Sequence, residues 1–262
     1  MGKPFAEFMK EFKEAIEVLR ASGHPEAFEA ISELARDLYD PDIRLSDWVN
    51  ELEGYNSKKS PSKAEQRRAG HVLEGIALAS FHCIKGVGSL TSYRAPDAQH
   101  DLLVRGKSGN WVAFCDYCHL DRTKRGVLVE AKAHRTPVSS SQFSRVCSNI
   151  DHTTLKGLVS LGTIFSLRGA TGFPTDTSDK REITLRDARL SQAVFYLITN
   201  TPVIVFSMSD LKQLSIPGAL PDLVECKVSE LFIQSGQITS RATDSCPVEI
   251  DIPDYLTEFR PL

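Results

Sequence analysis

The sequence predicts an α/β fold, with a mixed β-sheet flanked by helices and an N-terminal helical subdomain in front of it. Three observations lead to this class. Up to about residue 54, apolar residues recur at helical spacing. From residue 64, helical segments alternate with short apolar runs. There, meandering strands come first and strand–helix–strand crossovers second, so the sheet should contain both antiparallel and parallel neighbours.

The first 56 residues are expected to form the helical subdomain. Its first helix carries an apolar stripe, and a second helix follows "GHP". A third lies around "LSDWVNELEG", with Ser46 as its N-cap. We favour a bundle that packs on the rest of the chain over a separate recognition module. The loop-like segment "NSKKSPSK" marks the boundary. The stripe residues are Phe5, Phe8, Met9, Phe12, Ile16 and Leu19.

Residues 64–215 should form the core, and residues 216–262 a C-terminal extension whose alternation fits added strands or a dimer contact. One segment, "NWVAFCDY", is expected to be the hairpin partner of "HDLLVRG". A late helix begins at "SDLKQLS", capped by Ser209 or Asp210. Helices are predicted at 64–84, 139–150, 185–199 and 209–215, and strands at 100–106, 110–117, 126–133, 157–167 and 202–208.

Composition favours a soluble, cytoplasmic protein. The chain has 262 residues, of which 41% are hydrophobic and 25% charged, enough to bury a core. No apolar run reaches membrane-spanning length, and the N-terminus lacks the pattern of a signal peptide. Six cysteines suit a reducing compartment. The net charge of −3 gives no global basic field, although a neutral protein can still hold a basic cleft.

Charged residues end the apolar strands. Asp101 opens "DLLV", while Glu130 and Lys132 share one face of "GVLVEAK", since strand side chains alternate. Glu74 lies on the preceding helix. Phosphodiester hydrolysis by metal ions needs carboxylates from separate elements to hold a hard cation, with a cationic group near the attacked phosphate. This set therefore predicts a hydrolytic metal site, with a structural ion pair as the alternative.

These motifs resemble the PD-(D/E)xK nuclease superfamily, which has the restriction-endonuclease-like fold. The signature is Asp101, a gap, and then "EAK" at 130–132. An acid precedes it on the first helix, Glu74, and Gln142 follows it on the next helix. The family places Pro before its first acid, so Asp97 in "APDAQHD" is an alternative to Asp101; we prefer Asp101 because it begins the strand. The resemblance spans residues 64–215, especially to restriction and phage-defence effectors of prokaryotes.

This resemblance implies a Mg²⁺ site, in which Mn²⁺ is expected to substitute. Asp101 and Glu130 would ligate the ion directly, together with the backbone carbonyl of Ala131. Glu74 would complete the site through water or a second ion. Lys132 would orient or deprotonate the attacking water and offset charge in the transition state.

Gln142 would position that lysine or the substrate backbone. The implied activity is an endonuclease that hydrolyses DNA in antiviral defence, as a restriction or abortive-infection enzyme. It is expected to act as a homodimer or higher oligomer, because cutting both strands usually requires two sites. Two alternatives stay open: a nucleic-acid-binding or assembly protein with this fold but no turnover, and a related nuclease that acts on RNA.

Other features have simpler interpretations. Cys115 and Cys118 have zinc-knuckle spacing, but a single CxxC is a weak signal and buried thiols are the favoured interpretation over structural Zn²⁺. The tips "DRTKRG" and "KSGNW" are expected beside the site, where they would contact DNA. The loop "SLRGATGFP", with Arg168, is equally compatible with a phosphate contact and with a plain crossover.

Overall fold

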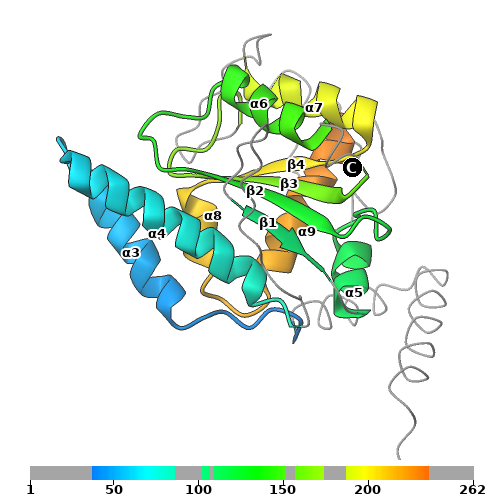
Figure 1. Cartoon of the computed structure of the whole chain (residues 1–262), viewed down its shortest axis with the longest axis horizontal. Coiled ribbons are helices and arrows are strands. Elements are labelled where there is room, and N and C mark those ends of the chain that lie inside the picture. Colours follow the sequence, from blue (N-terminus) through cyan, green and yellow to red (C-terminus); the bar gives the residue numbers. More distant parts are fainter. Residues whose placement is uncertain (1–36, 86–101, 107–108, 152–156, 174–186, 236–262) are drawn as a thin grey trace, which may run out of the picture.

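The computed structural model describes residues 37–85, 102–106, 109–151, 157–173 and 187–235. The first two predicted helices lie outside these residues. The described part has a mixed sheet with helices on both of its faces (Figure 1). No helix in the described ranges is both long and apolar enough to span a membrane.

The sheet has four strands in the order β1-β2-β3-β4. Strand β1 (Leu102–Arg105) runs antiparallel to β2 (Gly126–Lys132), whereas β2, β3 (Val159–Ser166) and β4 (Val203–Phe206) are parallel. The three parallel strands are largely buried, as expected for strands that are covered on both faces. The predicted mixed α/β class is confirmed.

The two faces of β2 belong to different hydrophobic clusters. Val127 and Val129 pack in the larger cluster, with α3 (Arg44–Ser57), α4 (Lys63–His82) and α9 (Ala219–Gln234). Leu128, between them, packs in the smaller cluster with α6 (Ser140–Asp151) and α7 (Ala188–Thr199). Figure 1 shows α6 and α7 along one side of the sheet and α3 and α4 on the other. By alternation, Glu130 and Lys132 lie on the face that α6 and α7 cover.

The prediction of a strand at 110–117 is wrong, because this segment is helix α5 (Gly109–Tyr117). Trp111, Phe114, Cys115 and Cys118 are all buried, and their three- and four-residue spacing places them on one side of a helix. The segment "DRTKRG" is therefore no hairpin tip beside Glu130. It leads into the start of β2, about 20 Å along the strand from Lys132 at roughly 3.3 Å per residue. The first two residues of "KSGNW" lie outside the described residues.

Two predicted caps and the C-terminal strands are also corrected. Helix α3 begins before Ser46, which lies in its first turn. Helix α8 (Met208–Gln213) has Ser207 as its N-cap, and Asp210 accepts a hydrogen bond from the Ser207 N–H (2.6 Å). The segment 219–234 is the helix α9 rather than added strands, because its residues at four-residue spacing are buried in the larger cluster. Those residues are Leu220, Val224 and Val228.

The packing of the larger hydrophobic cluster bears on the predicted domain boundaries. The buried side of α3, with Leu45, Val49 and Leu52, lies in the same hydrophobic cluster as α4 and the sheet. The C-terminal helix α9 enters that cluster too. The boundaries at residues 56, 64 and 215 stay predictions, but the described ends of the chain share one core with its centre.

Arg135 joins the segment after β2 to the end of α3, and its loss should destabilise the fold. Its Nη1 and Nη2 donate to the backbone carbonyls of Lys59 (3.1 Å) and Asn56 (3.3 Å). We expect Arg135→Ala to lower the free energy of unfolding by about 1–2 kcal/mol, because two carbonyls lose a charged donor. Urea titration followed by circular dichroism measures this. Arg122→Ala, which removes an exposed arginine elsewhere, should change it by less than about 0.5 kcal/mol; an equal loss in both variants would contradict the assignment.

Candidate active site

Glu130 and Lys132 lie at the carboxyl edge of the parallel strands. In the β2–β3 register, Glu130 is opposite Ile164 and Lys132 is opposite Ser166, the last residue of β3. The carboxyl ends of parallel strands meet at this edge, which is where open α/β sheets place their ligands. The Lys132 ammonium forms an ion pair with Oε1 of Glu130.

A third residue, Arg145, completes the cluster. It extends from α6, and its Nη2 lies 3.1 Å from the same Oε1 of Glu130. The Glu130 side chain is 3% exposed, that of Lys132 18% and that of Arg145 55%. A carboxylate this deeply covered requires cationic partners, because its desolvation costs several kcal/mol. With two cations on one carboxylate, the cluster carries one positive charge in excess.

Sequence reasoning did not single out Arg145. It assigned α6 a role at the site through Gln142, three residues earlier. In the structure the Gln142 Oε1 accepts a hydrogen bond from the backbone N–H of Ser139 (3.0 Å), and the Ser139 Oγ accepts one from the Gln142 N–H (3.4 Å). This reciprocal pair is a capping box that begins α6. The available signal for Arg145 was its place on the helix that directly follows β2, since such a crossover returns over the sheet.

Glu74 lies on an exposed side of α4. Helix α4 packs in the larger cluster, on the face of β2 opposite to the one that Glu130 shares. The structure thus puts the two carboxylates in different layers, and the role of Glu74 as a metal ligand stays a prediction.

Asp101 and its alternative Asp97 lie outside the described residues. The first residue of β1, Leu102, pairs with Val129, the neighbour of Glu130 along β2. The role of Asp101 as a metal ligand stays a prediction.

The carboxylate oxygens of Glu130 are suitable ligands for a hard cation. Carboxylate and carbonyl oxygens are the ligands that Mg²⁺ prefers, and Glu130 and the Ala131 carbonyl are of this kind. Within the described ranges no three His, Cys, Asp or Glu side chains gather in a group that could hold a metal.

Cys115 and Cys118 are both fully buried in the larger cluster. Burial raises the pKa of both thiols, and the Cys118 Sγ lies 3.6 Å from the carbonyl oxygen of Pro221 in α9. The geometry agrees with the interpretation of these cysteines as packing residues.

Buried thiols should react slowly, which gives a direct test. In native protein treated with iodoacetamide at mildly alkaline pH, Cys115, Cys118 and Cys147 should stay largely unlabelled, because burial keeps their thiolate fraction and access low; burial raises the pKa of Cys147 to about 12. Peptide mass spectrometry measures the labelling, and the half-buried Cys83 and Cys226 are internal references. Rapid labelling of Cys115 and Cys118 after chelation alone would instead indicate a bound metal.

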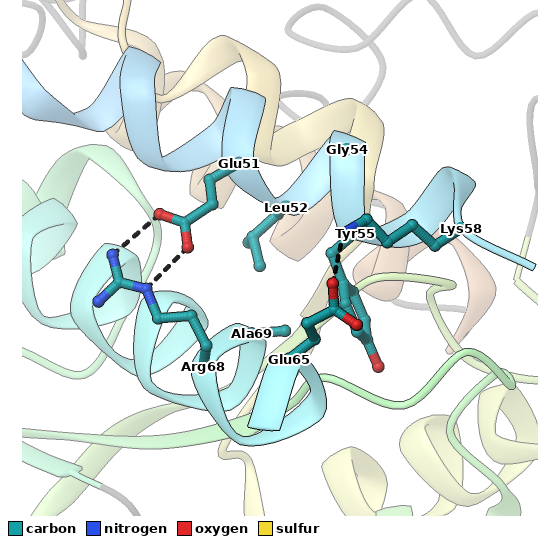
Figure 2. A pocket seen from close by; sticks show the side chains of 8 residues that line it. All are labelled: Glu51, Leu52, Gly54, Tyr55, Lys58, Glu65, Arg68 and Ala69. Carbon is teal, nitrogen blue, oxygen red and sulfur yellow. Dashed lines mark hydrogen bonds and ion pairs between the residues drawn. The ribbon is translucent and has the colours of Figure 1, made fainter. Parts of the chain in front are cut away.

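A groove of about 220 Å³ lies between α3 and α4 (Figure 2). Glu51 on α3 accepts two hydrogen bonds from Arg68 on α4 (2.7 and 2.9 Å). At the other end Lys58 binds Glu65, and the hydrogen bonds from Lys58 and from the N–H and hydroxyl of Ser62 lower the pKa of Glu65 to about 2. Because its charged side chains are paired across it, the groove is the packing interface between two helices. The remaining lining residues are Leu52, Gly54, Tyr55 and Ala69.

Comparison with known families adds nothing to this geometry. The chain matches no protein-family model, and a search among curated proteins finds no match. Function is therefore inferred from the residues themselves.

Proposed function

We propose that this chain is a Mg²⁺-dependent nuclease that hydrolyses DNA phosphodiester bonds at the carboxyl edge of its sheet. The observation that carries the proposal is the buried carboxylate of Glu130 beside Lys132, which lies two residues further along β2 on the same face. A surface ion pair would need no such burial, and a purely structural role would be served as well by apolar residues.

The architecture supports the same proposal. A mixed sheet whose acid-x-Lys strand lies between an antiparallel neighbour and a parallel one agrees with the restriction-endonuclease-like arrangement that the motifs suggest. The first predicted acid, Asp101, precedes that antiparallel neighbour directly. Arg168, exposed after β3, lies on the same edge of the sheet and suits a backbone phosphate.

The residues would divide the work as follows. Glu130, the Ala131 carbonyl and Asp101 would hold Mg²⁺, which supplies a polarised water and neutralises phosphate charge when it is bound. Lys132 would orient the attacking water by hydrogen bonding and stabilise the additional negative charge of the transition state. The low exposure of Glu130 and Lys132 limits competing water around these groups and so strengthens their electrostatic effect.

The resemblance extends the proposal to a homodimer in prokaryotic antiviral defence, with double-stranded DNA as the substrate. A second candidate is a nucleic-acid-binding protein without turnover. It is favoured by the excess positive charge of the cluster, because a Glu130 already paired with two cations leaves a net cation for phosphate without any metal.

The test is cleavage by the full chain. Supercoiled plasmid, linear duplex, single-stranded DNA and RNA are each incubated with Mg²⁺, Mn²⁺ or EDTA, and products are resolved on gels. Metal-dependent nicking or linearisation of DNA supports the proposal. Binding of DNA without cleavage in either metal would favour the binding protein, and cleavage confined to RNA would change the substrate class.

A further inference from the structure

Arg145 is the most exposed member of the cluster, and it binds Glu130 less tightly than Lys132 does. Its described polar contact is the one to the Glu130 Oε1, which it shares with Lys132. Lys132 stands two residues from Glu130 on the same strand and is mostly covered. Arg145 reaches the carboxylate from another element with a long side chain that is 55% exposed. When Arg145 leaves, Lys132 still neutralises the buried carboxylate, and the half-exposed guanidinium returns to water, so the cost is small.

A divalent ion bound to Glu130 would weaken the interaction between Glu130 and Arg145. The carboxylate would then be occupied by a stronger cation, and the guanidinium, at 3.1 Å from the ligand atom, would be repelled. A phosphate at the same edge would attract it, because the planar guanidinium fork matches phosphate oxygens in geometry and charge.

We propose that Arg145 is a substrate-binding residue that occupies Glu130 in the free protein and transfers to a backbone phosphate of the nucleic acid when metal and substrate bind. This inference rests on the proposed nuclease function and adds to it. Arg145 is then a competitor of the metal for Glu130, and at the same time a ligand of the DNA.

These two roles predict opposite effects of one substitution. In Arg145→Ala, Glu130 loses a competing cation, so the affinity for Mn²⁺ measured by calorimetry without DNA should rise roughly two- to five-fold. The affinity for duplex DNA, measured by fluorescence anisotropy in Ca²⁺, should fall about ten-fold or more, because a charged donor to phosphate is lost. Arg145→Lys should recover part of the DNA affinity.

The matched control is Arg122→Ala. Arg122 is 52% exposed and lies in the loop before β2, at the opposite end of that strand, 3.7 Å from Asp116. The Arg122→Ala variant removes the same charge as Arg145→Ala. It should change neither the Mn²⁺ affinity nor the DNA affinity by more than about two-fold.

Two results would overturn the inference alone. One is weaker Mn²⁺ binding in Arg145→Ala, which would mean that Arg145 merely holds Glu130 in place. The other is a DNA affinity equal to that of Arg122→Ala. Wild-type protein that binds neither Mn²⁺ nor DNA would overturn the nuclease proposal as well, which separates the two failures.

Discussion

Lys132→Met is expected to lower metal-dependent DNA cleavage about a hundredfold or more, the usual effect of removing one preorganised group that stabilises transition-state charge. Methionine keeps most of the length of the side chain, so the loss should reflect the ammonium. Glu130 keeps Arg145 as a partner in this variant, so the fold should persist. Single-turnover cleavage of a labelled duplex, at saturating enzyme, measures the chemical step.

Glu130→Gln should have an effect at least as large, because the amide removes the negative charge that would hold the metal while preserving shape. Here Mn²⁺ binding should also weaken, in contrast to Lys132→Met, where the metal site keeps its carboxylate. Measuring both quantities for both variants thus assigns the two residues separate roles.

The control for these variants is Lys124→Met. The side chain of Lys124 is 19% exposed, close to the 18% of Lys132, and its Nζ donates to the Thr201 Oγ1 (3.1 Å) near the opposite end of β2. It should cleave at close to the wild-type rate. Cleavage by Lys132→Met or Glu130→Gln at the rate of this control would show that the pair is a structural ion pair.

Phe165→Ala should produce the largest loss of stability, about 3–5 kcal/mol. Phe165 on β3 is fully buried between Phe81 of α4, at a ring-centroid distance of 6.3 Å, and Phe206 of β4, at 4.8 Å. Alanine removes a large apolar surface from the contact that joins α4 to the sheet and leaves a cavity there. Urea titration of the free energy of unfolding measures the loss.

Two further variants calibrate that result. Phe165→Leu keeps much of the volume and should cost clearly less. Leu197→Ala removes an aliphatic side chain that is 57% exposed on α7, and should stay within about 0.5 kcal/mol of wild type. A loss below about 1 kcal/mol in Phe165→Ala would argue against this packing of α4 on the sheet.

Local patterns were sufficient for the elements that form the centre of the fold. Strands β2 and β4 are short aliphatic runs, and α4 and α6 begin with serine caps followed by helical spacing, so each could be predicted from its own residues. The acid-x-Lys pair was predicted in the same way, since alternation along one strand already puts Glu130 and Lys132 on one face.

The secondary structure of short apolar segments was harder to predict from the sequence. The segment at 110–117 is apolar at nearly every position, so neither a period of two nor one of 3.6 stands out. What selects the helix α5 is the burial of Trp111, Phe114 and Cys118 together against the rest of the larger cluster. In α9, the polar residues between Val224 and Val228 suggested alternation, while packing against the core favours the four-residue period.

The sequence by itself thus determined the α/β class, most strands and helices of the described core, and the Glu130–Lys132 pair. Only the tertiary structure decided which residue of α6 reaches that pair, assigning Gln142 to a helix cap and Arg145 to the carboxylate. The physical reason is that a pair within one strand depends on local geometry alone. A contact between β2 and α6 depends on how a whole helix lies across the sheet and on how far a long side chain can extend from it.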